Sequence, residues 1–293
     1  MASIVDIAQI GVTVADRAAW ERFAADVLGF PTWRSDDGAL TYCRIDGYHH
    51  RLALRDGAAG LAYVTYDVGD AAGLQAWREA LSRKQVAWQP LAPAEAARRR
   101  VSAAIELCDP DGHRIALGHG FDVAPEPCRY TRPLSVLRLG HAALTVSDTA
   151  RAHQFYTDVL GFRLSDWVHV SDAIRLCFLR VNARHHALAL LPCGPGLAPR
   201  LQHAMVEVET LDDLMRSYHH ARAVGAPIGM GPGKHPNCET LHCYVQTPGG
   251  FALEFGYGHR RVNDATHQPV IFPAGTPVDV WGGDVQSPEF ILG

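Results

Sequence analysis

The sequence predicts an α+β fold made of two tandem copies of one unit. Residues 10–30 resemble residues 139–162, and both stretches run from a strand-like apolar segment through an acid to the shared ending Asp-Val-Leu-Gly-Phe. The acid suits a helix N-cap and the glycine suits a helix C-terminal cap, so each stretch reads as a strand followed by a helix of about a dozen residues. Similarity over this length indicates a duplicated unit.

The repeat continues through the rest of each copy. Residues 49–54 match residues 185–190, residues 63–68 match residues 203–208, and residues 109–116 match residues 247–254. The second matched pair precedes two helical segments, residues 70–84 and 211–224. Each half therefore reads as a strand and helix, a two-strand hairpin, a second strand and helix, and a final hairpin around a Pro-Gly turn.

The domain boundaries follow from the same comparison. Residues 122–133 contain three prolines and form the natural linker. We therefore expect an N-terminal domain over residues 1–124 and a C-terminal domain over residues 134–265. The remaining residues 266–293, including Ile291 and Leu292, are predicted to be a tail that packs back on the domains.

Composition excludes several classes of protein. The formal net charge of −4 gives no basic surface for nucleic acid, and no apolar run is long enough to span a membrane. The N-terminus lacks the shape of a signal peptide. Seven cysteines without CxxC pairs fit reduced thiols. We expect a cytoplasmic protein that contacts neither nucleic acid nor membrane.

A duplicated fold lets each position serve as a control for its counterpart. At three matched positions the second copy has a good metal ligand and the first does not: His141 against Gln9, His203 against Tyr63, and Glu254 against Ala116. The histidine distribution agrees, because 12 of the 16 histidines lie from residue 141 onward. Residues shared by both copies serve the fold, so function is sought where the copies differ.

Two imidazoles and one carboxylate on three strands of one curved sheet form the ligand set of a non-haem Fe(II) centre. The nitrogen and oxygen donors, without cysteine, favour Fe(II) or Mn(II) over structural zinc. A single strand histidine is more often a core or surface residue than a ligand. Because ligand-type residues replace other residues at three matched positions at once, we favour a metal site over a purely structural role for these side chains.

A longer motif carries a family resemblance. Gly233-Lys-His235, seven residues, Cys243-Tyr244, two residues, Thr247-Pro-Gly-Gly250, three residues and Glu254 resemble the signature of type I extradiol ring-cleavage dioxygenases. These enzymes belong to the vicinal oxygen chelate superfamily, and the two-domain members that cleave 2,3-dihydroxybiphenyl are the most similar. The resemblance implies that each domain is a pair of βαβββ modules forming an incomplete curved barrel.

The resemblance also implies residue roles. His141, His203 and Glu254 would be the iron ligands, as the repeat comparison indicates. His186 resembles the family's acid–base histidine, although its neighbour His185 remains an alternative, since adjacent strand residues point to opposite faces. The residues that would hydrogen-bond the substrate or oxygen are His235 and Tyr244.

The substrate pocket is predicted from three further residues. Ala143 lies two residues beyond a ligand on the same strand face, where a small side chain would make room for a bulky substituent. Asn237 and Cys238 follow His235 in the motif. Cys238 stands where relatives of the biphenyl-diol type often carry an acid, so the motif does not specify the substrate preference.

The sequence therefore predicts an Fe(II)-dependent extradiol dioxygenase, with Mn(II) as an alternative metal. It would cleave a substituted or bicyclic catechol, such as 2,3-dihydroxybiphenyl, and insert both atoms of O2. Relatives of this kind are commonly homo-oligomers. Two alternatives share the fold: a glyoxalase-type isomerase or thiol transferase, and a metabolite-binding protein. The first half lacks ligands at the three matched positions, which argues against sites assembled from paired modules.

Overall fold

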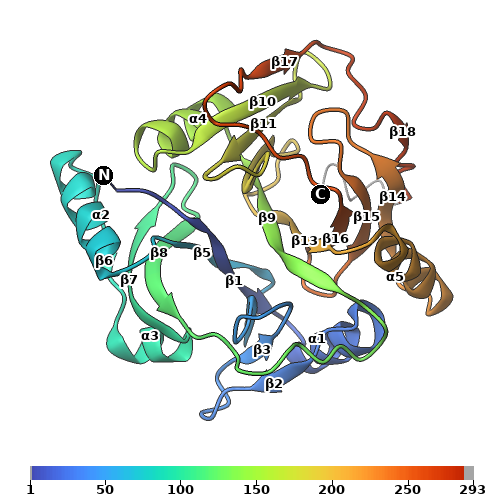
Figure 1. The fold of residues 1–293 in the computed structure, drawn as a ribbon, viewed down its shortest axis with the longest axis horizontal. Helices are drawn as coiled ribbons and strands as arrows, with labels where there is room; N and C mark the ends of the chain where they lie inside the picture. Colours follow the sequence, from blue (N-terminus) through green and yellow to red (C-terminus); the bar gives the residue numbers. More distant parts are fainter. Residues whose placement is uncertain (1, 287–293) are drawn as a thin grey trace.

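Two mixed β-sheets, each with helices on one side, make up the chain. The computed structural model describes residues 2–286, and its two sheets lie side by side (Figure 1). An eight-stranded sheet comes from the N-terminal half and a ten-stranded sheet from the C-terminal half. Both are open at their ends, so neither closes into a barrel. The predicted α+β class is confirmed.

Each half contains two βαβββ modules. The elements of the first half are β1 (Asp6–Val14), α1 (Arg17–Phe23), the π-helical turn η1 (Ala24–Leu28), β2 (Thr32–Arg34), β3 (Thr41–Cys43), β4 (Leu52–Asp56), β5 (Gly60–Asp67), α2 (Ala71–Arg83), β6 (Gln89–Pro90), α3 (Pro93–Arg98), β7 (Val101–Cys108) and β8 (Arg114–Phe121).

The second half repeats this order. Its elements are β9 (Val136–Val146), α4 (Thr149–Asp158), β10 (Arg163–His169), β11 (Arg175–Arg180), β12 (Leu188–Pro192), β13 (Leu201–Val208), α5 (Leu211–Ala223), β14 (Ile228–Lys234), β15 (Leu241–Gln246) and β16 (Ala252–Tyr257). Two short tail strands follow, β17 (Val270–Phe272) and β18 (Trp281–Gly282).

The modules join through their first strands. The strand order is β2-β3-β4-β1-β5-β8-β7-β6 in the first sheet and β17-β10-β11-β12-β9-β13-β16-β15-β14-β18 in the second. β1 pairs antiparallel with β5, and β9 pairs antiparallel with β13. The first strands of the two modules therefore form the centre of each sheet, and the strand that follows each helix (β2, β6, β10 and β14) lies farthest from the centre within its module.

The expected two-strand hairpin after each helix is wrong, because three strands follow it in every module. The missed strands are short or interrupted. β2 has three residues, β6 has two, and β14 carries Gly229, Gly231 and Pro232, which are residues typical of turns. The three-strand arrangement implied by the family resemblance is the correct one.

The predicted helix caps are present in both copies. Asp16 accepts a hydrogen bond from the backbone N–H of Ala19, and Asp148 accepts from those of Ala150 and Arg151. Gly29 and Gly161 follow the helices at φ values of 86° and 69°, in the left-handed region that favours glycine. Local chemistry thus ends both helices where the repeat predicts.

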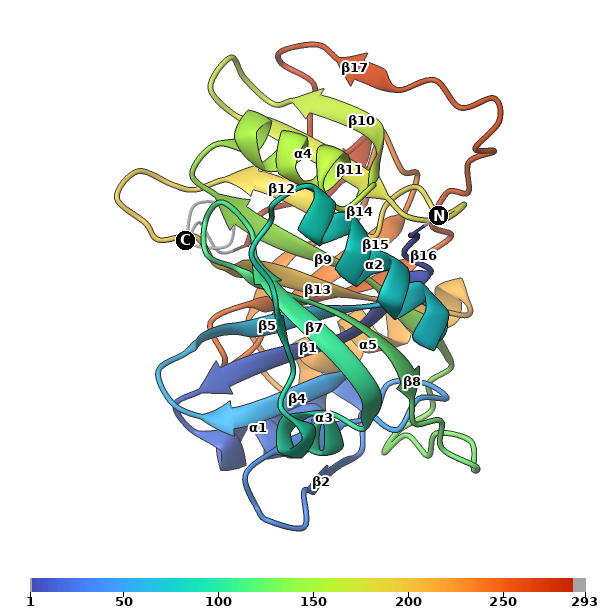
Figure 2. The ribbon, with the colours of Figure 1, turned by 90° about the vertical axis from the view of Figure 1, so that its left-hand side faces the viewer.

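The helices cover one face of each sheet. α2 packs on β7 and β8, α4 packs on β11 and β12, and α5 packs on β14, β15 and β16. Figure 2 shows α2 and α4 lying outside the strands. Because strand side chains alternate between faces, residues on the helix-free face of the second sheet are available for a site.

The apolar core is continuous across the two halves. The largest cluster of buried apolar residues includes members from both sheets. The ring of Trp20 stacks on that of Phe251 with centroids 6.2 Å apart, and Phe30 contacts Phe255 at 6.0 Å. Each pair joins the first module to the strand hairpin around Glu254, so the first half supports the second.

The tail adds strands at both edges of the second sheet. β17 pairs with β10 and β18 pairs with β14. The last part of the predicted tail, residues 287–293 with Ile291 and Leu292, lies outside the described residues.

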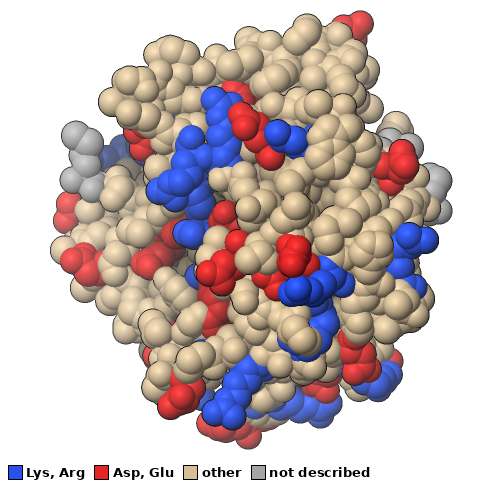
Figure 3. All heavy atoms as spheres, turned by 45° about the vertical axis from the view of Figure 1, so that its right-hand side comes forward, with Lys and Arg blue, Asp and Glu red and all other residues tan. Residues whose placement is uncertain are grey.

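On the surface shown in Figure 3, acidic and basic side chains are interspersed. Among residues 2–286, no helix is both long and apolar enough to cross a membrane.

Candidate metal centre and its pocket

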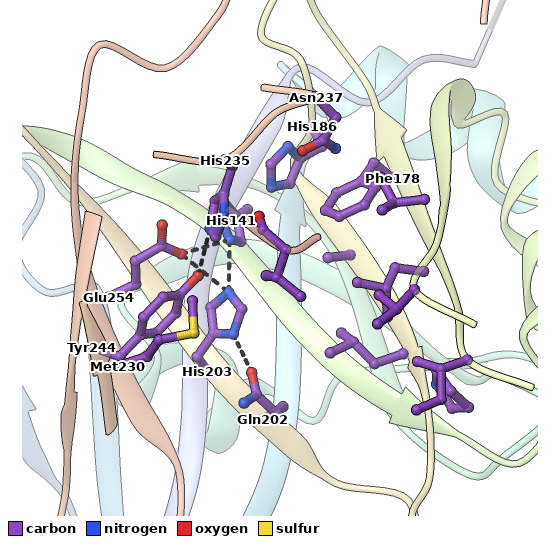
Figure 4. A pocket seen from close by; sticks show the side chains of 18 of the residues that line it. His141, Phe178, His186, Gln202, His203, Met230, His235, Asn237, Tyr244 and Glu254 are labelled. Atoms are coloured by element: carbon purple, nitrogen blue, oxygen red, sulfur yellow. Dashed lines mark hydrogen bonds and ion pairs between the residues drawn. The ribbon is translucent and has the colours of Figure 1, made fainter. Parts of the chain in front are cut away.

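Three neighbouring strands bring the predicted ligands together. His141 on β9 and Glu254 on β16 pair in register with the same residue of β13, and His203 lies two residues earlier on β13. The Nε2 atoms of His141 and His203 are 2.9 Å apart, and Glu254 Oε2 lies 3.3 Å and 3.2 Å from them. Figure 4 shows the three side chains turned toward one another.

This arrangement fits a bound cation. Ligand bonds of about 2.1 Å at right angles place ligand atoms about 3.0 Å apart, close to the separations found here. Glu254 is only 1% exposed, and a buried carboxylate needs a compensating charge. Two imidazoles and one carboxylate supply the nitrogen and oxygen donors of a non-haem iron or manganese site.

The protonation states of His203 and Glu254 also suit a metal. Burial lowers the pKa of His203 to about 4, so its imidazole is neutral at pH 7. Burial alone would raise the pKa of the Glu254 carboxyl, but the imidazoles of His141 and His203 outweigh it and hold the pKa well below its usual range. A neutral imidazole and an ionised carboxylate are the forms that coordinate metals.

Gln202 orients one of the ligands and was not predicted. Its Oε1 atom contacts His203 Nδ1, and a carbonyl oxygen can only accept. The hydrogen of His203 therefore sits on Nδ1, which leaves Nε2 free to face the centre. Only its position next to a ligand could have indicated Gln202.

His235 and Tyr244 lie together beside the centre. His235 Nε2 is 2.9 Å from the Tyr244 hydroxyl, and its Nδ1 is 3.0 Å from Asp279 Oδ1. His242 stacks on His235 at 3.8 Å and also contacts Asp279, at 2.6 Å. Asp279 and His242 were both missed, since Asp279 lies in the tail, whose path the sequence does not predict.

The paired histidines 185 and 186 precede β12, so the expectation that they lie on a strand with opposed faces is wrong. His186 lines the pocket, and its ring centroid is 4.1 Å from that of His141. His185 turns away toward Asp166. A further unpredicted histidine, His259, lies 4.7 Å from the His186 ring.

A cavity of about 430 Å³ adjoins the predicted ligands. Apolar side chains form most of its wall: Val168, Val170, Ile174, Leu176, Phe178, Leu191, Met230 and Val278. Asn237, which the sequence predicts to contact the substrate, also lines it. Ala143 and Cys238 are buried and are not part of the wall, and Cys238 instead accepts a hydrogen bond from the Thr240 hydroxyl.

The matched region of the first half is filled by side chains. Tyr63, which replaces His203, lies under the guanidinium of Arg99 at 3.6 Å. Gln9, which replaces His141, donates to the Arg99 carbonyl at 2.9 Å. A cationic side chain and an aromatic ring therefore occupy this part of the first half, which offers no ligand set comparable to that of the second.

Fold and site define a vicinal oxygen chelate protein with two imidazoles and one carboxylate in the second domain. The model of the Glyoxalase/Bleomycin resistance protein/Dioxygenase superfamily matches residues 138–255, and that of the Dihydroxybiphenyl dioxygenase BphC D1 matches residues 8–57. An iron-dependent extradiol dioxygenase of Rhodococcus jostii (strain RHA1) is 31% identical, over 96% of this chain and 97% of its own. The chain belongs to the extradiol dioxygenase family.

Solved structures of related enzymes have the same fold as this chain. BphC, described as a halotolerant catechol dioxygenase, superposes with a TM-score of 0.91 at 26% identity, covering 99% of this chain and 97% of its own. The Mn(II)-bound glyoxalase from Novosphingobium aromaticivorans has a TM-score of 0.84 at 27% identity, covering 100% and 95%. The fold therefore accommodates both predicted metals in its relatives.

Proposed function

We propose that this enzyme uses Fe(II) and O2 to cleave the ring of a catechol beside its two hydroxyl groups. One observation carries the proposal: His141, His203 and Glu254 converge within 3.3 Å of one another at the wall of an apolar cavity. A triad of this kind holds one face of the metal and leaves positions for substrate and oxygen. Mn(II) is the alternative metal.

His141, His203 and Glu254 would hold the metal. When bound, the metal would accept both catechol oxygens and O2 and lower the pKa of the catechol hydroxyls. With a single carboxylate, the ligand set leaves a divalent ion with net positive charge, which an anionic catechol offsets. The buried site strengthens this attraction, because little water screens it.

His186 is our candidate for the acid–base residue. Burial, together with the neighbouring His141 and His259, lowers the pKa of His186 well below its usual value. The imidazole is therefore neutral before substrate binds, and it can accept a proton from a catechol hydroxyl. His185 faces Asp166 instead of the cavity, which favours His186 over its neighbour.

Tyr244 and His235 would orient the substrate and stabilise developing negative charge. Burial opposes protonation of His235, but its hydrogen bond to Asp279 outweighs this and raises the pKa of the imidazole. In its protonated form, His235 would donate to the Tyr244 hydroxyl through Nε2.

The apolar wall indicates the substrate class. Polar groups gather near the ligand triad, whereas Val170, Ile174, Leu176 and Phe178 line the rest of the cavity. We propose a catechol with a bulky apolar substituent, such as 2,3-dihydroxybiphenyl, with Asn237 as a polar contact. Ala143 and Cys238 do not reach the wall, so we assign neither to substrate binding.

The decisive experiment is anaerobic reconstitution with Fe(II), followed by exposure to O2 with a panel of mono- and bicyclic catechols. We expect O2 uptake and a yellow ring-fission product, strongest with the bicyclic members. Glu254→Ala should lose bound iron and activity together. Absence of colour and of O2 uptake with every catechol would overturn the proposal.

The same preparation separates the two alternatives. A glyoxalase-type isomerase would turn over its substrate without consuming O2, and a metabolite-binding protein would need no tightly held metal. The isomerase alternative should be tested because an Mn(II)-bound glyoxalase is among the structures similar to this chain. Parallel assays with Mn(II) in place of Fe(II) identify the metal that supports turnover.

We propose that the enzyme forms a homo-oligomer. Light scattering, which measures the molar mass of the particle in solution, checks this. A cytoplasmic location fits the seven cysteines, all of which are free thiols. Fractionation of the producing cells checks the location.

A further inference from the structure

A buried chain of three side chains leads away from the pocket behind His186. Asp166 Oδ2 lies 2.6 Å from His185 Nε2, and the Nδ1 atoms of His185 and His186 are 3.1 Å apart. Asp166 and His185 are fully buried, and His186 is 3% exposed. The chain therefore connects a carboxylate to the imidazole that faces the substrate cavity.

The carboxylate is held in a fixed orientation. Its second oxygen, Oδ1, accepts the backbone N–H of Val270 on β17 at 2.9 Å. Among the described residues, His185 is the only ion-pair partner of Asp166. Oδ2 must therefore accept from His185, because a carboxylate has no hydrogen to donate.

These contacts determine where the hydrogens lie. His185 carries its hydrogen on Nε2 and donates it to Asp166, which leaves Nδ1 of the neutral ring as an acceptor. Burial lowers the pKa of His185, which keeps that ring neutral at pH 7. His186 must then donate from its own Nδ1, so its Nε2 bears a lone pair.

The first half of the chain offers a natural control. His49 and His50 form the same pair, with Nδ1 atoms 3.0 Å apart. Where the second half has Asp166, the first has Trp33, whose ring meets His49 edge-on at 5.1 Å. Strand pairing establishes this equivalence: Trp33–Tyr42–Ala53 in the first half and Asp166–Phe178–Ala189 in the second.

The histidine pair therefore belongs to the duplicated fold, and the carboxylate is found only beside the metal-ligand triad. We propose that Asp166 and His185 are positioning residues that keep His186 as the tautomer with an unprotonated Nε2, available to accept the proton of a catechol hydroxyl. This inference rests on the proposed role of His186. Neither positioning residue touches the substrate.

Asp166→Asn tests the inference with little change of shape. The Val270 N–H still requires an acceptor, so the new amide turns its oxygen toward Val270 and its NH2 toward His185. The hydrogen of His185 then moves to Nδ1, and that of His186 moves to Nε2, where it blocks the base. The same substitution acts through the wrong tautomer in serine proteases.

The Fe(II) holoenzyme of Asp166→Asn should lose about 10²-fold or more in kcat. Iron content, melting temperature and the anaerobic Kd for catechol should stay at wild-type values. His49→Asn, a change at the first-half position that matches His185, should leave kcat unchanged. A kcat within about 3-fold of wild type, or a parallel loss of iron and stability, would overturn the inference.

A second measurement does not depend on the variant. In wild-type enzyme loaded with diamagnetic Zn(II), 15N NMR of labelled histidine should show the His186 hydrogen on Nδ1. A hydrogen on Nε2 would refute the tautomer assignment. If instead His186→Phe retains full turnover, the proposed function of His186 fails, whereas inactive His186→Phe with fully active Asp166→Asn contradicts only the further inference.

Discussion

Glu254 occupies the register position that Ala116 occupies in the first half. Ala116 lies opposite Thr65 on β5, and Glu254 lies opposite Met205 on β13, so the two sheets place these residues identically. One substitution therefore separates a buried methyl group from the carboxylate that we propose as a metal ligand. At the residue scale, function depends on which side chain occupies a position, because the two halves have the same backbone arrangement there.

His186→Phe is the residue-scale prediction. Phenylalanine fills the space of the ring without a basic nitrogen, so kcat should fall about 10²–10⁴-fold while iron content stays unchanged. Steady-state ring cleavage and iron analysis check this. The matched change His50→Phe in the first half should leave kcat unaltered. Unchanged kcat in His186→Phe would refute the acid–base assignment.

At the scale of elements, the tail is held against β14 and β15. Val278 lines the cavity, and its carbonyl contacts His235 Nδ1 at 3.1 Å. Burial opposes ionisation of Asp279, but hydrogen bonds from His235 and His242 lower the pKa of its carboxyl to about 2. The tail is thus coupled to the pocket through Val278 and through the ion pairs of Asp279 with His235 and His242.

Asp279→Asn should destabilise the protein by about 1–3 kcal/mol near pH 5.5. The lowered pKa of Asp279 adds stability above its ordinary value of 3.8, and this is lost as pH falls toward 2. The raised pKa of His235 adds stability below 6.5 that is lost as pH rises further. The difference from wild type should therefore be largest between about pH 4 and 6.5.

Urea unfolding across pH 3–8 measures this difference. Asp284→Asn is the matched control, because Asp284 is an exposed acid of the same tail. Its effect should stay within about 0.5 kcal/mol at every pH. A pH-independent deficit in Asp279→Asn would exclude the ion pair as its cause.

At the scale of the whole molecule, the first half supports the second half, which contains the proposed metal ligands. Trp20 on α1 is fully buried and stacks on Phe251, three residues before Glu254. The apolar core runs through both sheets. We therefore expect the two halves to unfold as one cooperative unit.

Trp20→Ala should cost about 3–5 kcal/mol, because it leaves a large cavity between the halves. The urea concentration at the unfolding midpoint, measured by circular dichroism, and the urea concentration at which bound iron is lost should fall together. Trp33→Ala, which removes a ring that is 37% exposed, should cost less than about 1 kcal/mol. Unfolding of the first half alone, while the second half still holds iron, would contradict a shared core.

The sequence alone determined the duplication, the caps of the first helix in each half and the three matched positions at which only the second copy has ligand-type residues. These features are local or can be found by aligning the chain with itself. The repeat pattern underestimated the strands, because short or glycine-containing segments such as β6 and β14 owe their strand conformation to pairing with neighbours.

The tertiary structure alone decided which distant side chains support the site. Alternation along a strand indicates which face a residue takes, but not which residue lies across from it. Asp279 reaches His242 from 37 residues away because the tail folds back. Asp166 on β10 reaches His185, which precedes β12, because β11 pairs with both strands. The sequence indicated the proposed ligands, and folding decided which residues lie beside them.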